Sequence, residues 1–392
     1  MNKPSDFEIE LERMDRDISE LKEAALAARV DSQTATKFAY RLYQRAALAG
    51  NLSEFETAEA AIERAIRQIG PAPDLYFIKA NLDFTFHRLA EVRRDLELGT
   101  GLRDSLQGRA LQADMDFQEG RYEEAERAYE RLIRDSRTWD NLVRLAYLRA
   151  RMGDVSGAEQ LYVEAEDELT AKEMRAYAWV ELQRGALDLR HGRYDEAWAH
   201  YDRANRAYSG YWLVEEHMAE ALGARGNFEE AVALYEKVIA RAPRPEFRQA
   251  LGELYEFMGR PDLAQPCYEK ALAAYIESAD RGEVHYYHHL SDFYSDVRED
   301  GREAVRWAAR DVEMRENFST LAALAWAFYR DRRFTDAMDT INKALSSGVR
   351  DAHIFRQAGM IYLSAGEKDE GDRYLRMASE INPHHSGFHV HR

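Results

Sequence analysis

The stretch GRYEEA at residues 120–125 decides the fold, because the chain repeats it with small changes. It returns as GRYDEA at residues 192–197 and as GNFEEA at residues 226–231. Counting from the last alanine of this phrase, a small residue recurs at intervals of 32 to 40 residues, at Ala58, Ala90, Ala125, Ala158, Ala197, Ala231, Ala264, Ala304, Ala337 and Gly371. A period of this length indicates a repeat array in which each unit packs only on its neighbours.

Two further residue types keep a fixed distance from this small anchor residue. A tyrosine follows it by four residues in five successive units, at Tyr129, Tyr162, Tyr201, Tyr235 and Tyr268. A glycine precedes it by five residues in six units, at Gly120, Gly153, Gly192, Gly226, Gly259 and Gly366. We expect the glycine in a turn between two helices, where it adopts a positive φ most easily. The anchor then lies where two helices cross closely, and the tyrosine fills the space one helical turn further on.

This pattern resembles the tetratricopeptide repeat family, whose unit is a helix–turn–helix of ~34 residues. Leu251-Gly252 with Tyr255, and Ala358-Gly359 with Tyr362, match earlier positions of the family's motif. The resemblance covers residues 36–383 and implies an all-α fold, a right-handed α-solenoid of about ten units. It divides the chain into an N-terminal amphipathic helix within residues 1–35, the repeat array at 36–383 and a histidine-rich tail at 384–392.

The units are not equally regular. The second unit (anchor Ala90) and the eighth (anchor Ala304) lack both the glycine and the aromatic residue. Two intervals are longer than the rest, which predicts extended helices or loops near residues 166–176 and 273–283. The eighth unit therefore departs from the pattern and also follows a long connection.

Composition limits the classes of partner. The chain has 71 acidic and 54 basic residues, a net charge of −17, so its field repels phosphate backbones and nucleic acid is not expected as a partner. We expect no signal peptide and no membrane insertion, since no stretch approaches the ~20 apolar residues of a membrane span. With Cys267 as the single cysteine, a cytoplasmic protein is expected, and the excess of arginine over lysine hints at a bacterial source.

The resemblance also implies a concave groove, lined by the first helix of each unit, that holds extended peptides or helices. Carrying the family's groove positions over residue by residue gives Arg144, Tyr147, Arg151, Trp179, Arg190, Glu216, Glu220, Glu253, Glu256, Trp326, Tyr329 and Arg356. Such a groove is basic in the middle, acidic later and aromatic near its end. The hypothesis is a partner segment with both signs of charge, its basic part over units six to eight. The alternative is that these are ordinary solvated helix faces.

Histidines cluster at two places and suggest a different function. His285, His288, His289 and Asp292 fall in the eighth unit, and a spacing of four brings His285 with His289, and His288 with Asp292, onto one helix face. The tail adds His385, His389 and His391. Neutral imidazole binds Zn²⁺ or Ni²⁺ well, so a transition-metal site is the alternative function. The simpler interpretation is a polar groove with a polar tail and no cofactor.

The N-terminal residues form an amphipathic stripe. Its apolar positions alternate steps of four and three: Phe7, Leu11, Met14, Ile18, Leu21, Ala25 and Ala28. The stripe could cap the first repeat, lie in the chain's own groove, or form a homodimer through residues 7–28. A cap is the simplest role, because terminal repeats need one.

No catalytic motif is present. The sequence contains no phosphate-binding loop, nucleophile elbow or zinc-protease signature. The sequence therefore predicts a non-catalytic scaffold or adaptor that binds a protein or peptide in the concave groove of a solenoid.

Overall fold

The computed structural model describes residues 3–27 and 29–390 of the chain, and every regular element in those residues is helical. A single helix, α1 (Asp6–Ala25), comes first. Five helix pairs follow: α2 (Ser32–Ala49) with α3 (Leu52–Ile69), α4 (Pro73–Thr85) with α5 (Leu89–Leu98), α6 (Leu106–Gln118) with α7 (Tyr122–Asp135), α8 (Trp139–Arg151) with α9 (Val155–Asp167), and α10 (Met174–Arg190) with α11 (Tyr194–Ala207).

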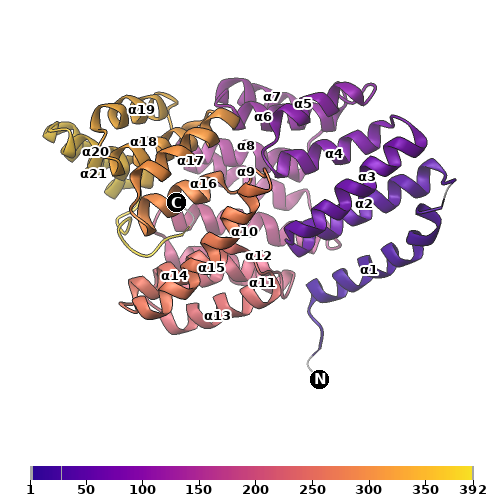
Figure 1. Ribbon diagram of the computed structural model, residues 1–392, viewed down its shortest axis with the longest axis horizontal. Helices are drawn as coiled ribbons and strands as arrows, with labels where there is room; N and C mark the ends of the chain where they lie inside the picture. Colours follow the sequence, from indigo (N-terminus) through magenta and orange to yellow (C-terminus); the bar gives the residue numbers. More distant parts are fainter. Residues whose placement is uncertain (1–2, 28, 391–392) are drawn as a thin grey trace.

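Five more pairs complete the chain (Figure 1). They are α12 (Trp212–Ala224) with α13 (Phe228–Arg241), α14 (Pro245–Phe257) with α15 (Pro261–Asp280), α16 (Tyr287–Asp292) with α17 (Gly301–Met314), α18 (Phe318–Arg330) with α19 (Phe334–Ser346), and α20 (Ala352–Ser364) with α21 (Lys368–Ile381). We number these pairs one to ten. The prediction of an all-α solenoid of ten helix–turn–helix units is confirmed.

The turn inside each pair is built in one way throughout. In all ten pairs, the residue two positions before the second helix has a positive φ, at Gly50, His87, Gly120, Gly153, Gly192, Gly226, Gly259, Glu299, Arg332 and Gly366. At Gly120 the φ is 76°, and the next amide, from Arg121, donates to the carbonyl of Asp116 at 2.8 Å. This hydrogen bond closes the first helix of the pair. The role predicted for the six glycines is confirmed.

The small anchor residues are packed as expected, with one correction. Ala125 is fully buried and Tyr129 lies beside it, one turn on, also buried. In the second pair, however, Ala90 is exposed, and Val92 and Leu96 are the buried residues. The anchor of this unit is therefore Val92, four residues after the helix cap, as in most other pairs. Sequence similarity favoured the alanine, but the turn at His87 fixes which face of α5 points inward.

The two long intervals have separate causes. The first contains a loop from Glu168 to Glu173 followed by the long helix α10, and the second is an extension of α15 to Asp280. Pair eight is irregular as predicted. Its first helix, α16, is short and continues into a π-helical turn, η1 (Phe293–Val297).

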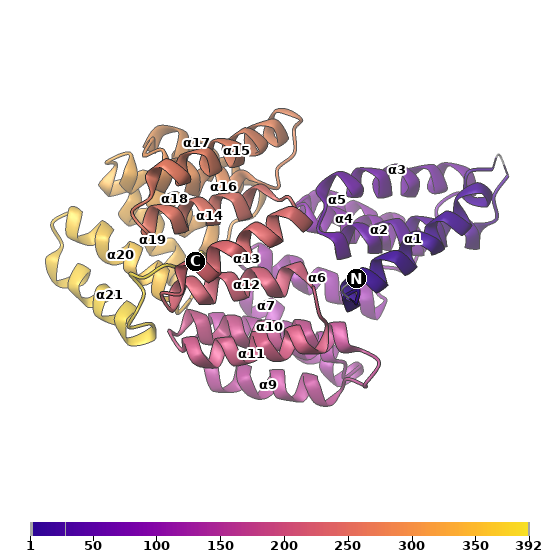
Figure 2. The ribbon, with the colours of Figure 1, turned by 90° about the horizontal axis from the view of Figure 1, so that it is seen from below.

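Segments far apart in the sequence lie side by side, because the solenoid winds back over itself (Figures 1 and 2). The turn of pair two meets the start of pair eight, where the rings of His87 and His285 stack with centroids 5.8 Å apart. Pair three meets pair nine, where the Asn317 amide donates to the carbonyl of Gln118 at 2.8 Å. The solenoid thus returns to itself after six pairs.

The same offset joins pair four to pair ten. Arg151, at the end of α8, pairs with Asp351 at the start of α20 at 2.9 Å, and both side chains are nearly inaccessible to solvent. Burial alone would raise the pKa of Asp351, but Arg151 and backbone amides stabilise the carboxylate and lower the pKa to about 2. A buried charge requires such a partner.

Helix α1 covers the first pair. Its stripe faces the chain itself, since Phe7, Met14 and Ala25 are buried. Phe7 also stacks on Tyr211, ahead of α12, with ring centroids 6.3 Å apart. This placement fits a cap. The homodimer through residues 7–28 stays a prediction, and Ala28 lies outside the described residues. Among the described helices, none combines the length and apolar character of a membrane span.

Candidate functional site

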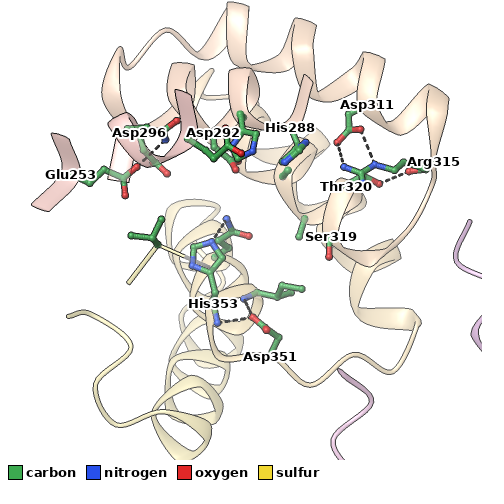
Figure 3. Close-up of a pocket in the computed structure, with 18 of the residues that line it drawn as sticks. Glu253, His288, Asp292, Asp296, Asp311, Arg315, Ser319, Thr320, Asp351 and His353 are labelled. Atoms are coloured by element: carbon green, nitrogen blue, oxygen red, sulfur yellow. Dashed lines mark hydrogen bonds and ion pairs between the residues drawn. The ribbon is translucent and has the colours of Figure 1, made fainter. Parts of the chain in front are cut away.

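The inner surface of pairs six to ten encloses an acidic cavity of about 320 Å³. Its walls come mainly from α12, α14, α16, α18 and α20, the first helices of these pairs, with Arg151 of α8, Asp311 of α17 and Val390 completing the lining. We call it the acidic cavity, because its lining holds seven carboxylates and two arginines: Glu216, Glu246, Glu253, Asp292, Asp296, Asp311, Asp351, Arg151 and Arg315. In Figure 3, Glu253, Asp292 and Asp296 lie on one side, and Asp351 with His353 lies on the other.

Arginines pair with three of the seven carboxylates. Arg315 pairs with Asp311 at 3.0 Å, Arg151 pairs with Asp351, and Arg244, from outside the lining, pairs with Glu246. Two buried acceptor atoms on the lining, Gln357 Oε1 and His288 Nδ1, have no hydrogen-bond partner in the structure. Burial lowers the pKa of His288 well below its usual value, so its ring is neutral, and a ring nitrogen without a proton can accept a hydrogen bond. The cavity therefore offers acceptors to a cationic or hydrogen-bond-donating group.

The π-helical turn η1 shapes one wall. Asp296 lies within it, and the indole Nε1 of Trp326 donates to Asp296 at 2.9 Å. Arg330 donates to the Ser295 carbonyl of the same turn at 2.6 Å. Such turns widen a helix locally and are frequent at functional sites. Here the turn holds Asp292 and Asp296 on the lining of the acidic cavity, through contacts from the next pair.

A second and larger cavity of about 730 Å³ lies inside pairs one to five. We call it the aromatic cavity, because nine aromatic residues line it: Tyr40, Tyr43, Phe84, Phe117, Tyr129, Trp139, Tyr147, Trp179 and Tyr211. Except for Tyr211, they come from α2, α4, α6, α7, α8 and α10. Aromatic rings supply large apolar contact areas at low conformational cost.

One guanidinium is fixed within the aromatic cavity. Arg144 contacts Asp114 at 3.1 Å and Asp140 at 2.8 Å. Burial raises the pKa of Asp114 despite this contact, and the Tyr129 hydroxyl donates to the same carboxylate at 2.9 Å. The positive charge of Arg144 is thus neutralised inside the protein. Its aliphatic stem, together with Tyr147 and Trp179, provides apolar surface on the cavity wall.

The structure divides the predicted groove residues among these sites. Arg144, Tyr147 and Trp179 line the aromatic cavity, and Arg151, Glu216 and Glu253 line the acidic cavity. Arg190 and Arg356 line a cavity of about 100 Å³ beside the C-terminal segment, and Glu220 contacts that segment. Trp326 stacks on Tyr329 with centroids 4.6 Å apart. Glu256 is exposed on α14 and accepts a hydrogen bond from Tyr268 at 2.6 Å.

The predicted metal ligands separate into two groups. His288, His289 and Asp292 line the acidic cavity, whereas His285 lies in a turn before α16 and packs on Phe86 and His87. The helix spacing expected for His285 and His289 is therefore not realised. His385 and His389 lie in the small cavity near Arg356, and His391 lies outside the described residues. Within residues 3–27 and 29–390, no group of three or more histidine, cysteine or carboxylate side chains is arranged to hold a metal ion.

Sequence reasoning missed three sets of residues. His87 faces the histidines of pair eight, although it stands almost 200 positions earlier. The aromatic residues of α2, α4 and α6 belong to weaker units, where the motif gave no groove positions. Phe388, in the expected polar tail, is 4% exposed and belongs to the core. A lone phenylalanine among histidines and glycine was the available signal for it.

The comparisons with known proteins agree with this fold. Two family models of the tetratricopeptide repeat match residues 217–256 and 245–275, the pairs around α12 to α15. The chain contains tetratricopeptide repeats over residues 217–275. An array of such repeats has the architecture of a protein-interaction scaffold. No curated protein matches the sequence.

Several solved structures are similar to this chain. A tetratricopeptide repeat protein from Parabacteroides merdae is 19% identical, with a TM-score of 0.38 over 62% of this chain and 93% of that one. The APC/C hetero-tetramer Cut9-Hcn1 is 16% identical, with a TM-score of 0.46 over 96% and 80%. MamA is 21% identical, with a TM-score of 0.34 over 43% and 96%. None of these likenesses bears on what this chain binds.

Proposed function

We propose that the chain is a non-catalytic scaffold that holds an extended protein segment on its inner surface, with a cationic part in the acidic cavity and an apolar part in the aromatic cavity. The observation that carries this proposal is the composition of the acidic cavity, seven carboxylates and two arginines. Attraction between opposite charges is stronger where water is partly excluded. A lysine or arginine side chain of a partner also supplies the N–H donors that Gln357 Oε1 and His288 Nδ1 lack.

The two cavities together favour a peptide over a small ion. Their volumes, about 320 and 730 Å³, suit several side chains, and most residues that line them belong to first helices of the pairs. Alternate aromatic and charged pockets along a groove are how extended segments gain specificity. The proposal needs no cofactor, and the zinc or nickel alternative gains no support from the described residues.

Selection from a library of random displayed peptides tests this function. We expect bound peptides to be enriched in lysine or arginine together with an aromatic residue. A Glu253→Lys chain should lose the preference for lysine and arginine, since a positive charge then lines the cavity. The matched control is Glu229→Lys on the outer helix α13, whose side chain is 80% exposed, and it should select the same peptides as the wild type. Equal selection by all three chains contradicts the proposal.

A further inference from the structure

The segment after the last helix turns back into the solenoid. Helix α21 ends at Ile381, and Asn382 then reverses the chain: its side-chain oxygen accepts from the amide of His384 at 2.8 Å. The amide of Gly387 closes a second turn on the carbonyl of His384 at 2.8 Å. In Figures 1 and 2 the segment that follows α21 consequently runs back over the molecule and does not extend beyond α21. We call residues 382–390 the return segment.

The return segment is anchored by one aromatic side chain. Phe388 packs against Gly223 of α12 and lies edge-on to Phe257 of α14, with ring centroids 6.1 Å apart. A Cβ atom at position 223 would lie 2.5 Å from Phe388 Cδ1, which is too close for two carbon atoms that are not bonded. The ring therefore fits because position 223 is glycine. Gly223 thus completes a pocket for one aromatic ring, and Phe388 occupies it.

A buried carboxylate holds the end of the segment. Glu220 of α12 is inaccessible to solvent, and its Oε1 accepts from the backbone amide of Val390 at 2.6 Å. The Nδ1 of His389 lies 2.6 Å from the same oxygen. Removing a carboxylate from water is costly unless donors replace the lost water. The return segment supplies two such donors, one from the backbone and one from an imidazole.

The contacts of the segment are those of a bound peptide. It touches the first helices of pairs six and seven, and Val390 reaches the lining of the acidic cavity. Further back, the His384 ring packs on Tyr194 of pair five with centroids 5.4 Å apart. A peptide bound in a helix-lined groove is typically a short segment that inserts an aromatic anchor into a pocket. The return segment does this and also donates hydrogen bonds to a fixed carboxylate. The segment thus covers part of the surface to which the proposed function assigns a partner.

We propose that the return segment is a tethered ligand, and that a partner binds over α12 and α14 by displacing it with a phenylalanine-like ring followed by a cationic or N–H-donating residue. This inference rests on the proposed function and names the chemistry of the partner at one place in the groove. The tether lets the segment rebind at a high effective concentration, so a partner must compete with it. Binding of the partner then releases residues 382–390 from the inner surface.

A peptide added to the full chain tests the proposal. The probe is a fluorescein-labelled peptide with the sequence of residues 382–390, and fluorescence anisotropy reports its binding. We expect the Phe388→Ala chain to bind the probe at least about tenfold more tightly than the wild type, because its own segment competes poorly. A Phe388→Ala, Gly223→Ala chain should bind it no better than the wild type, since the added Cβ fills the aromatic pocket. A probe with alanine in place of its phenylalanine is the matched control and should not bind.

Equal probe affinity for the wild-type and Phe388→Ala chains overturns the proposal. If the Phe388→Ala chain does not fold, hydrogen exchange on the wild-type chain decides. Excess unlabelled probe should then accelerate exchange of the Val390 amide, and an unchanged rate overturns the tethered-ligand role. The two proposals fail separately. If the selected peptides depend on Glu253 but leave the Val390 amide protected from exchange, the scaffold function is supported and displacement of the return segment is contradicted. If the probe accelerates exchange of the Val390 amide but peptide selection does not depend on Glu253, displacement is supported and the proposed function is contradicted.

Discussion

At the scale of single residues, backbone conformation at one turn position governs every unit. Seven of the ten turns place glycine there, and His87, Glu299 and Arg332 adopt the same left-handed conformation without it. A residue with a Cβ atom pays roughly 1–2 kcal/mol in this conformation. The surrounding pair packing is strong enough to impose it. These three positions are therefore local sites of strain that the sequence pattern, which sought glycine, passed over.

We expect Arg332→Gly to stabilise the protein by about 0.5–1 kcal/mol, because glycine adopts the φ of 61° at this position without strain. The greater conformational entropy of glycine in the unfolded chain offsets only part of this gain. The side chain of Arg332 is exposed, so little packing is lost. The urea midpoint should rise. The control is Lys343→Gly, an exposed position inside α19, which should lower stability by about 1 kcal/mol. A lower midpoint for Arg332→Gly contradicts the strain argument.

At the scale of elements, the turn and not the most similar side chain sets the register of the second helix. Val92 and Leu96 of α5 occupy the places that alanine and tyrosine hold in α7, and with Val92 as anchor the flanking intervals become 34 and 33 residues. A larger anchor is tolerated here because Leu96 is smaller than tyrosine. The larger valine and the smaller leucine together fill the space between the two helices that alanine and tyrosine fill in the third pair.

Two substitutions on opposite faces of α5, one buried and one exposed, test this register. Val92→Ala removes two methyl groups from a fully buried site and should cost about 1–3 kcal/mol. Ala90→Ser lies on the exposed face and should change stability by less than about 0.5 kcal/mol. The midpoints of thermal unfolding report both. The reverse ranking, with Ala90→Ser the more damaging change, returns the anchor to Ala90.

At the scale of the whole molecule, contacts six pairs apart hold the solenoid closed. The contact between pairs two and eight contains the partly exposed side chains of His87, His285 and His288. Desolvation lowers the pKa of each below its usual value, to about 3 at His285. The cations Arg244 and Arg315 and the neighbouring His289 lower the His285 pKa further, whereas Glu246 opposes them. The rings are neutral in the folded chain, so protonation works against this contact.

The sign of the pH dependence follows. In the unfolded chain these histidines take up protons near pH 6.5, but in the folded chain only at much lower pH. Their contribution to stability is complete above about pH 6.5 and is lost as the pH falls, by up to about 1.4 kcal/mol per pH unit for each group. We expect the unfolding free energy to fall and the radius of gyration, measured by X-ray scattering, to rise between pH 6.5 and pH 4.5.

A His285→Phe chain is the control for this pH effect. It keeps an aromatic ring against Phe86 but cannot be protonated, so its stability should fall less steeply over the same range. An identical slope in the two chains means that other groups cause the pH dependence. We expect mild acid to open the acidic cavity as well, because His288 belongs both to this contact and to the lining.

The sequence by itself determined the repeats, the paired helices and the glycine turns of six units, because these depend on contacts within about 40 residues that recur along the chain. The family resemblance assigned Arg144, Tyr147 and Trp179, and separately Glu216 and Glu253, to a groove; in the structure the first three line the aromatic cavity and the last two line the acidic cavity. Only the tertiary structure decided that His87 meets His285, that Arg151 meets Asp351 and that Phe388 fills the pocket at Gly223. These contacts depend on the small rotation between successive pairs, which accumulates over six of them and leaves no period in the sequence.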